Sequence, residues 1–432
     1  MPSTHRRSGR PNEMEIHLPY GRSTVSATIP GGRRVDVVEL GDTPAAPDPI
    51  EEVRSALANP VGGFVWPAVG QVRSVAIAVN DKTRPVPHRR LLPPLMDRLA
   101  GLGIPDEAIT FFIAVGGHPP MDPTEFPAVL PDWVLTRYRV VSHDAERVDD
   151  LVDRGLTPRG TPVRVNRDFV EADLRIVVGT VEPHQFVGFS GGVKSAAIGL
   201  AGLATITANH TLMAHPDARI GTYEDNPARQ DVEEIGRLIG VDLALNVVID
   251  QRREIVRALA GDPVAVMEHG HPIARRLGQV AVSQEYGLVI SSPGGHPKDL
   301  NVYQSQKAVA SAARIVRPGG IIILAAACPE GAGSRRYEQW VAAKRSRREV
   351  RDAFRAEGFR IGPHKAFQLA RDTERAHLLV CSDMPDELSR RLLLEPVADL
   401  QTAVDVATAE LGPDERVAVL PHATSTIPYV DT

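Results

Sequence analysis

Val75-Ala76-Ile77-Ala78-Val79 is a short apolar run that stops at the polar loop of residues 80–87, and it indicates the fold class. The same pattern returns at Phe111–Val115 and at Leu174–Val178, and the latter run leads into the glycine-rich loop of residues 179–192. Short apolar strands that end in polar loops and alternate with helical segments are typical of α/β units with a mostly buried parallel sheet. We therefore predict an α/β fold with mainly parallel sheets.

The pattern begins again in the last third of the chain. A run at Leu288–Ile290 is followed by helical spacing over Val302–Val316, and Pro318-Gly319-Gly320 is predicted to turn into a strand over Ile321–Ala327. A charged helix is predicted over Arg335–Glu357. These elements predict a second α/β domain, and ligands of such folds bind at the carboxyl ends of the strands. We expect the active site in a cleft between the two domains.

The boundary between the domains is predicted near Ile273 to Ser283, after Gly270-His271-Pro272, a stretch with the residue types of a connecting segment. The two domains would then span residues 1–275 and 276–432. Within the first of them, Glu15–Ile29 alternates in a strand-like way around a central Leu-Pro-Tyr-Gly and is predicted to form a hairpin or a meander.

The composition fits a globular protein with a sizeable core. The chain has 432 residues, of which 43% are hydrophobic, and its formal net charge of -5 does not indicate a basic nucleic-acid footprint. Two cysteines exclude a disulfide framework, and no apolar run reaches the ~20 residues that a membrane span requires. The basic residues 1–12 lack the apolar stretch of a signal peptide. We therefore predict a cytoplasmic protein that binds neither nucleic acid nor membrane.

The most informative loop contains Gly188-Phe189-Ser190-Gly191-Gly192-Val193-Lys194. A glycine-dense loop lets backbone N–H groups approach an anion closely, and a helix that starts near Lys194 would add its N-terminal dipole. The segment ends like a P-loop, but Val193 stands where that motif requires a glycine, so a nucleoside triphosphate site is a poor interpretation. Phosphate binding in general and a plain structural turn stay open as alternatives.

Polar and cationic side chains also follow other predicted strands. His118, His184 and His210 stand at strand ends or in loops, and neutral imidazole is both a proton acceptor near pH 7 and a nickel ligand. A single histidine is more often a hydrogen-bonded structural residue, but three in the loops of one domain favour a site. The segment Asp81-Lys82-Thr83-Arg84 adds a guanidinium suited to a carboxylate, with a plain turn as the alternative.

These motifs, in this order, resemble the nickel-dependent lactate racemase family. The resemblance covers nearly the whole chain and rests on short blocks, namely Leu18-Pro19-Tyr20-Gly21, Asp-x-Thr-Arg-Pro at Asp81, Gly-His at His118, Gly-Phe-Ser-Gly-Gly-x-Lys at Lys194, Asn209-His210, Glu224-Asp225-Asn226-Pro227, Gly294-Gly295-His296-Pro297 and Tyr303-Gln304-Ser305-Gln306-Lys307. The resemblance implies a racemase or epimerase that inverts the C2 carbinol centre of a 2-hydroxy acid.

The resemblance also implies a covalent cofactor. Lys194 matches the lysine that the family joins through a thioamide to a nickel-pincer nucleotide, the nickel complex of pyridinium-3-thioamide-5-thiocarboxylic acid mononucleotide. His210 matches the histidine that completes the nickel site, and enzymes that build the cofactor would be transient partners. Further cofactor contacts are implied for Asp81, Thr83, Gly188, Ser190, Gly191 and Gly192.

The implied reaction requires two bases. His118 and His184 match the family's paired acid/base histidines, and contacts to the substrate are implied for Arg84, Lys307, Gln304 and Tyr303. One histidine would remove the hydroxyl proton while hydride passes to the cofactor, and the 2-keto acid would take hydride back on its opposite face. Hydride transfer avoids a carbanion beside a carboxylate.

The chain departs from the family's motifs at three places. Pro119 follows His118, Val193 precedes Lys194, and His296 stands at an aromatic position, where it would contact a polar substrate or replace a packing side chain. The identity of the 2-hydroxy acid is therefore open. Two alternatives are a non-catalytic protein that binds the nickel cofactor and a hydroxy-acid dehydrogenase with a dissociable nicotinamide cofactor. The dehydrogenase motif, Gly-x-Gly-x-x-Gly after an N-terminal strand, is missing from the sequence.

Overall fold

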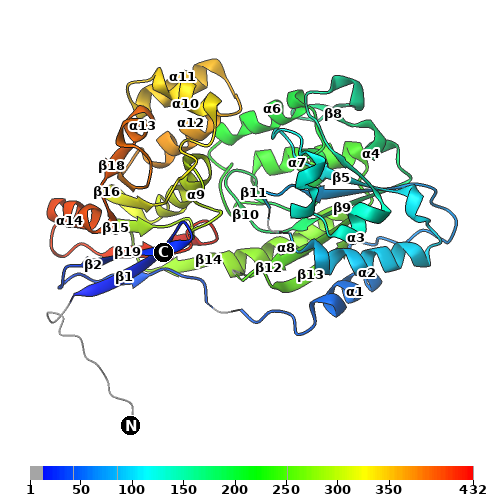
Figure 1. Cartoon of the computed structure of the whole chain (residues 1–432), viewed down its shortest axis with the longest axis horizontal. Coiled ribbons are helices and arrows are strands. Elements are labelled where there is room, and N and C mark those ends of the chain that lie inside the picture. Colours follow the sequence, from blue (N-terminus) through cyan, green and yellow to red (C-terminus); the bar gives the residue numbers. More distant parts are fainter. Residues whose placement is uncertain (1–12, 42, 85, 251, 432) are drawn as a thin grey trace, which may run out of the picture. The chain divides into compact units, whose positions relative to one another are not determined.

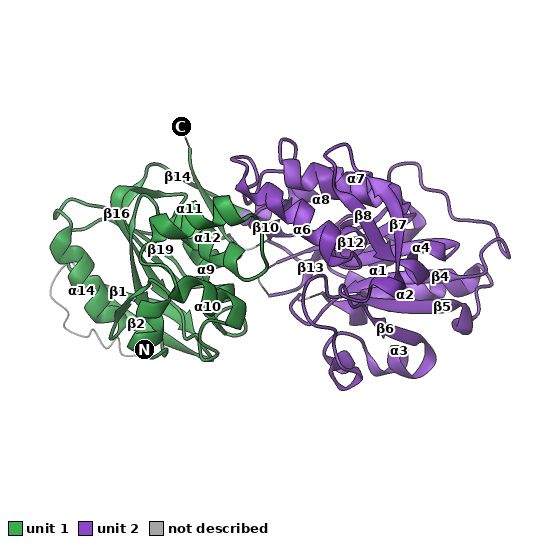
Figure 2. Cartoon of the chain, turned by 90° about the horizontal axis from the view of Figure 1, so that it is seen from above, with its two compact units in different colours: residues 1–40, 279–432 green, residues 41–278 purple. Residues whose placement is uncertain are grey.

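The chain folds into two compact units. The computed structural model describes residues 13–41, 43–84, 86–250 and 252–431. Unit 2 runs from Gly41 to Gly278, and unit 1 combines the described residues up to Leu40 with those from Gln279 onward (Figure 2). The chain therefore passes from unit 1 to unit 2 and back.

Unit 2 is built on a six-stranded sheet with the order β13-β12-β9-β4-β5-β6, in which only β13 is antiparallel to its neighbour. The strands are β4 (Val75–Asn80), β5 (Ile109–Ala114), β6 (Arg139–Ser142), β9 (Leu174–Thr180), β12 (Leu243–Ile249) and β13 (Ile255–Gly261). All of β4 except its last residue is buried, as expected for a central strand that is covered on both faces.

Helices cover both faces of this sheet. The helices are α1 (Pro49–Ala58), α2 (His88–Gly101), α3 (Asp132–Arg137), α4 (Arg167–Glu171), α5 (Lys194–Ala197), α6 (Leu203–Thr211), α7 (Pro227–Ile239) and α8 (Pro263–Gly278). Helices α1 and α2 lie side by side (Figure 1) and pack on the face that carries Val75, Ile77 and Val79. On the opposite face the small side chains of Ala76 and Ala78 let α5 approach β4 closely.

Short elements complete unit 2. Two antiparallel pairs are formed by β7 (Leu151–Leu156) with β8 (Pro162–Asn166) and by β10 (Pro183–His184) with β11 (Gly188–Phe189). Single turns of 3-10 helix occur at Asp106–Ala108, Pro123–Ala128, Val148–Asp150 and Leu212–Ala214.

Unit 1 has a six-stranded, fully parallel sheet with the order β18-β17-β16-β15-β19-β3. The strands are β3 (Val35–Val37), β15 (Tyr286–Ser291), β16 (Val316–Ala325), β17 (His377–Cys381), β18 (Glu395–Val397) and β19 (Val417–Leu420). The helices are α9 (Val302–Ala312), α10 (Arg335–Ala342), α11 (Arg347–Glu357), α12 (Pro363–Asp372), α13 (Asp386–Arg391) and α14 (Leu400–Glu410). Strand β14 (Gln279–Val282) pairs in parallel with β20 (Ile427–Val430).

The predicted α/β class, the parallel sheets and the hairpin are confirmed. The hairpin is formed by β1 (Met14–Tyr20) and β2 (Ser23–Ile29), but it belongs to unit 1 and not to the domain predicted over residues 1–275. Its apolar side chains share a core with β15, β16 and α14, and β3 extends the unit 1 sheet beside β19. The interdomain cleft stays a prediction.

The chain leaves unit 2 after Gly278, within the predicted boundary of Ile273 to Ser283, and Gly270-His271-Pro272 lies inside α8. One predicted helix differs from the structure. The charged segment Arg335–Glu357 forms two helices, because Ser346 caps a new helix by accepting a hydrogen bond from the backbone N–H of Glu349.

Each sheet contains one point where the strand order reverses. In unit 2 the chain moves outward from β4 to β5 and β6 and then returns to the other side of β4 with β9. In unit 1 it moves outward from β15 to β16, β17 and β18 and returns to the other side of β15 with β19. Open α/β sheets bind ligands at the carboxyl ends of the two strands that flank such a reversal. The pairs β4/β9 and β15/β19 are therefore the places to look for sites.

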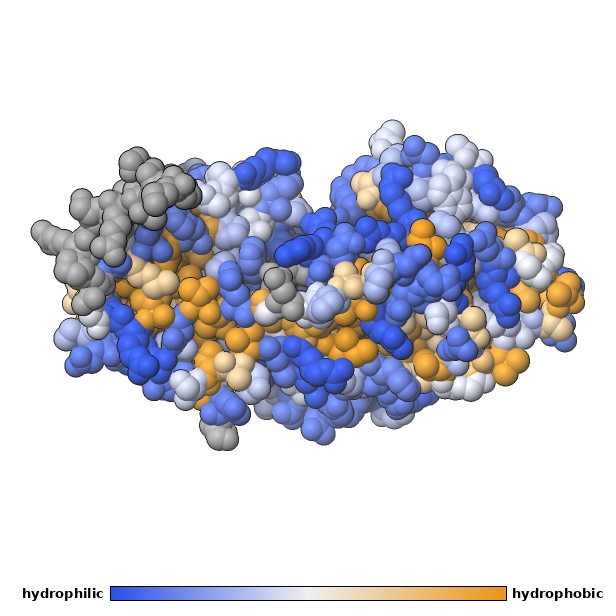
Figure 3. Space-filling model, turned by 90° about the horizontal axis from the view of Figure 1, so that it is seen from below, coloured by the Kyte–Doolittle hydropathy of each residue, from blue (hydrophilic) through white to orange (hydrophobic). Residues whose placement is uncertain are grey.

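The surface gives no sign of a membrane-spanning helix. No helix among the described residues is long and apolar enough to cross a membrane. Figure 3 shows hydrophobic residues in groups separated by hydrophilic ones, and the large exposed hydrophobic side chains are spread along the chain, among them Val37, Val65, Val69, Val148 and Leu156.

Candidate active site

The reversal in unit 2 brings together three loops that contain predicted site residues. Asp81, Thr83 and Arg84 directly follow β4, and His118 lies in the loop after β5. The segment from Val181 to Lys194 follows β9. Because β4, β5 and β9 are neighbouring parallel strands, their carboxyl ends lie at one edge of the sheet.

Asp81 fixes the orientation of His118. The Nδ1 atom of His118 donates to Oδ2 of Asp81 at 2.8 Å, and the backbone N–H and hydroxyl of Thr83 donate to Oδ1 at 3.1 and 2.6 Å. Burial by itself would raise the pKa of Asp81, but the hydrogen bond and charge of His118, the Thr83 hydroxyl and the Arg84 guanidinium lower it. The ionised carboxylate holds the proton on Nδ1, so Nε2 of the exposed imidazole is the basic nitrogen.

A buried guanidinium holds the glycine-rich loop. Arg229 is 1% exposed and donates to the backbone oxygens of Phe189 and Gly191 at 3.1 Å each, while its Nε donates to Glu233 at 2.7 Å. On the other side of the loop the amide oxygen of Asn246 accepts from the N–H of Gly192 at 2.6 Å. The loop is thus fixed by side chains from α7 and β12.

The glycines of this loop are required by its packing. A Cβ atom at Gly188 would lie 1.7 Å from the backbone oxygen of Thr222, and one at Gly192 would lie 2.6 Å from Cγ of Met267. Both glycines have positive φ angles. The loop is therefore a tightly packed structural turn, and whether its N–H groups also contact a phosphate stays a prediction.

Lys194 is the first residue of α5, as the predicted helix start required. This helix has only four residues, so its dipole adds little to anion binding. Burial, and then the positive charges of Arg84 and Arg229, lower the pKa of Lys194 to about 7, whereas Asp81 and Glu182 act in the opposite direction. A large share of the Lys194 side chains is therefore neutral and nucleophilic at neutral pH.

His184 and His210 both pack against one aromatic ring. The ring centroid of Phe186 is 5.1 Å from that of His184 and 4.8 Å from that of His210. His210 is in the last turn of α6, and the preceding residue, Asn209, anchors this turn by donating to the backbone oxygen of Ala228 at 3.0 Å. Two imidazoles are thus held close together beside the loop that leads to Lys194.

The remaining predicted residues lie in unit 1 on the first turns of α9. Lys307 donates through Nζ to the side-chain oxygen of Gln304 at 2.7 Å, and the hydroxyl of Tyr303 lies 3.4 Å from Nε2 of His364. Burial raises the pKa of Tyr303 to about 12, so its hydroxyl is neutral. Helix α9 follows β15, one of the two strands that flank the reversal in unit 1.

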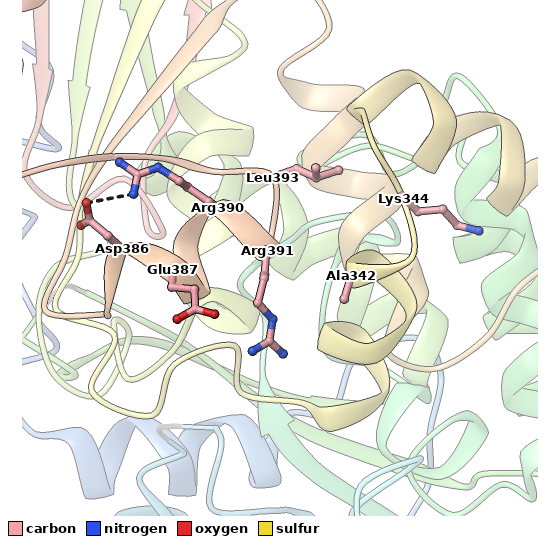
Figure 4. A pocket seen from close by; sticks show the side chains of 7 residues that line it. All are labelled: Ala342, Lys344, Asp386, Glu387, Arg390, Arg391 and Leu393. Atoms are coloured by element: carbon pink, nitrogen blue, oxygen red, sulfur yellow. Dashed lines mark hydrogen bonds and ion pairs between the residues drawn. The ribbon is translucent and has the colours of Figure 1, made fainter.

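A hollow elsewhere in unit 1 does not contain these residues. Figure 4 shows it, with a volume of about 620 Å³ and a lining of Ala342, Lys344, Asp386, Glu387, Arg390, Arg391 and Leu393. Its cations are paired, since Arg390 contacts Asp386 at 3.1 Å, Arg391 contacts Glu338 and Lys344 contacts Glu357 at 3.6 Å. This hollow therefore offers no concentrated charge to a ligand.

The sequence prediction missed the residues that support the site. Asn226 caps α7 by accepting from the N–H groups of Ala228 and Arg229, and its amide donates to the backbone oxygen of Phe186 at 2.7 Å. An asparagine followed by a proline is a readable signal for a helix start. The role of Arg229 has no such signal, because its partners lie about 40 residues earlier in the chain.

Comparison with known proteins identifies the family. Residues 20–221 match the lactate racemase N-terminal domain, and residues 282–428 match the lactate racemase C-terminal domain. The lactate racemases of Thermoanaerobacterium thermosaccharolyticum and Lactiplantibacillus plantarum are each 29% identical to the chain, cover 95% of it, and are themselves covered over 98% and 99% of their length.

Solved structures agree with this assignment. The lactate racemase apoprotein of T. thermosaccharolyticum superposes with a TM-score of 0.89 at 29% identity, over 96% of this chain and 100% of that one. A protein of Thermotoga maritima shares the fold, with a TM-score of 0.65 at 17% identity over 91% of this chain and 100% of that one. The chain is thus a racemase, an enzyme of the isomerase class. It belongs to the lactate racemase family.

The lowered pKa of Lys194 can be tested by chemical labelling. Brief treatment with an amine-acylating reagent at a series of pH values, followed by mass spectrometry of the Lys194 peptide, should give half-maximal labelling near pH 7. In concentrated urea, where burial is lost, the midpoint should move toward the ordinary value of 10.5. Arg84→Gln should raise the midpoint of the folded protein, because it removes a neighbouring positive charge. Equal midpoints in buffer and in urea would contradict the assignment.

Proposed function

We propose that the chain inverts the C2 centre of a 2-hydroxy acid with a nickel-pincer nucleotide joined covalently to Lys194. The observation that carries the proposal is the gathering of Lys194, the Asp81–His118 pair and His184 in loops at one sheet edge. The lactate racemase relatives support the reaction class. The proposal includes a cytoplasmic location. The two cysteines, Cys328 and Cys381, are both free and buried, which fits a reducing compartment.

The residues present fit the proposed cofactor. A lysine with a pKa of about 7 is the nucleophile that a bond to an activated carboxyl group requires. Among the described residues no group of three or more His, Cys, Asp or Glu side chains could hold a metal ion by itself. The nickel of the proposed pincer nucleotide would need only one ligand from the protein. His210 would supply it, because imidazole is a good nickel ligand. Enzymes that build the cofactor are then transient partners.

The chain's own residues divide the reaction between them. Arg84 and Lys307 hold the carboxylate of the substrate, with Gln304 and Tyr303 as further polar contacts. Nε2 of His118 takes or returns the hydroxyl proton on one side, and His184 does so on the other. When bound, the cofactor supplies a hydride acceptor and donor for C2. Two bases are needed because the two enantiomers present the hydroxyl group differently.

Asp81 has a defined task in this scheme. By accepting from Nδ1 it keeps the second ring nitrogen of His118 free of a proton, and its charge stabilises the imidazolium that forms when the base takes a proton. Because Asp81 is only 6% exposed, its carboxylate acts on His118 with little screening by water.

The cofactor assignment can be tested by intact mass and nickel content of protein made together with the cofactor-building enzymes. The parent should carry one nickel-containing adduct, and Lys194→Met, which keeps the shape but lacks the amine, should carry none. His210→Ala should keep the adduct but lose nickel, because one of the four ligands is removed. An adduct of equal mass on Lys194→Met would refute attachment at this residue.

The two bases can be tested separately with the cofactor-loaded protein. His118→Gln and His184→Gln should each lower the racemisation rate by about 10²–10⁴-fold while the adduct mass is retained, because proton transfer contributes that much to such reactions. Circular dichroism or chiral chromatography of the hydroxy acid gives the rate in both directions. Unchanged racemisation in either variant removes that histidine from the pair.

The task of Asp81 predicts a kinetic signature. Asp81→Asn should lower kcat by about 100-fold or more with little change in KM, because the substituted amide favours the wrong tautomer of His118. Glu125→Gln is the matched control, since it removes an exposed carboxylate that pairs with Lys82 in a nearby loop. The control should stay within about twofold of the parent. Equal effects of the two substitutions would contradict an orienting role.

A further inference from the structure

Three loops meet at the reversal of the unit 1 sheet. One follows β15 (residues 292–297), one follows β19 (residues 421–426), and the third is the turn of the β1–β2 hairpin (residues 20–22). The first two loops lie at the carboxyl ends of the strands that flank the reversal, which is the place where open α/β sheets bind ligands.

Hydrogen bonds join these loops into one rigid frame. The N–H of Ser292 donates to the backbone oxygen of Leu420, and the N–H of Ala423 donates to that of Ser292, both at 2.9 Å. The hydroxyl of Thr424 donates to the backbone oxygen of Pro293 at 2.7 Å. A site on this frame needs little rearrangement to bind a ligand.

The hairpin turn is tied to the same frame. The N–H of His296 donates to the backbone oxygen of Gly21 at 2.7 Å, and the N–H of Gly21 donates to Oδ2 of Asp299 at 2.6 Å. The same oxygen of Asp299 accepts from the N–H of Ala327 at 3.2 Å, and Asp299 is 1% exposed. The buried carboxylate of Asp299 is therefore satisfied by backbone N–H donors.

Cationic and imidazole side chains project from this frame. Arg22 donates to Nε2 of His296 at 3.2 Å, and both side chains are exposed. His296 is therefore not a buried packing residue. Lys298 donates to the hydroxyl of Ser425 at 2.8 Å, which places its ammonium group on the loop after β19.

His422 and Lys298 both lie close to Gly294. A Cβ atom at Gly294 would be 3.1 Å from Nδ1 of His422, which is tight, and 3.6 Å from Cδ of Lys298, which is an ordinary contact. Burial, and then the positive charge of Lys298, lower the pKa of His422, while Glu39 acts in the opposite direction. His422 is therefore a neutral imidazole near pH 7 that can donate one hydrogen bond.

We propose that Arg22, His296, Lys298 and His422 bind a carboxylate group of the substrate at the unit 1 reversal. Arg22 supplies a fork of N–H groups that matches a carboxylate, and Lys298 supplies a second positive charge. The proposed function, on which this inference rests, already assigns Lys307, on α9 of the same unit, to the carboxylate beside C2. A second anion site therefore specifies a 2-hydroxy acid with two carboxylates, such as malate, rather than lactate.

Kinetics of the cofactor-loaded enzyme with malate and with lactate test the proposal. The parent should have a higher kcat/KM for malate, and Arg22→Gln should lower this value by about tenfold or more, since a hydrogen bond to a charged group contributes that much. The value for lactate should change by less than about twofold. Arg348→Gln, which removes an arginine whose side chain is 86% exposed in α11, is the matched control and should alter neither value.

Binding to the cofactor-free protein separates this inference from the proposed function. Titration calorimetry should show malate binding to the parent more tightly than lactate, and this difference should disappear in Arg22→Gln and in Lys298→Met. The same difference in a loaded protein that racemises neither acid would keep the anion site and overturn the proposed function for these two substrates. Equal binding of both acids, or no effect of either substitution, overturns the anion site.

Discussion

In both units the loops that contain most of the candidate residues are positioned by a single reversal of strand order. The two crossover connections that leave the starting strand must cover opposite faces of a parallel sheet, so the loops at its carboxyl end separate and leave side chains exposed between them. In unit 2 this constraint places Asp81 and the segment ending at Lys194 beside the adjacent strands β4 and β9. In unit 1 it places His296 and His422 beside β15 and β19.

Within unit 2, one buried ion pair stabilises the loop on which the chemistry depends. Arg229 and Glu233 are 1% and 7% exposed, and removing one partner of such a pair typically costs about 3–5 kcal/mol because a buried charge is left uncompensated. Arg229 also satisfies two backbone oxygens of the glycine-rich loop. After burial and the charge of Arg84, the same guanidinium also lowers the pKa of Lys194, so one side chain both holds the loop and adds to the reactivity of the lysine.

Burial acts in opposite ways on the two key ionisable groups. For Lys194 it favours the neutral amine, and the neighbouring guanidinium groups add to this effect. For Asp81 burial alone would favour the neutral acid, but the hydrogen bonds from His118 and Thr83 and the charge of Arg84 outweigh it. At the same pH the amine of Lys194 is thus largely neutral while the carboxylate of Asp81 is ionised, because hydrogen bonds from His118 and Thr83 stabilise the charge of Asp81.

Local sequence patterns were enough to predict strands such as β4, β5 and β9, the hairpin, and the loops that hold His118, His184 and Lys194, because apolar runs of strand length bounded by polar residues are local signals. Such patterns could not place the segment up to Leu40 with unit 1, since β3 pairs with β19 nearly 400 residues away. Long-range contacts also bring Asp81 to His118, bring His210 to the ring of Phe186 that His184 also contacts, and bring Arg229 to the glycine-rich loop. These contacts join residues distant in the chain, and no local pattern encodes them, because they form only when parallel strands bring their carboxyl ends together.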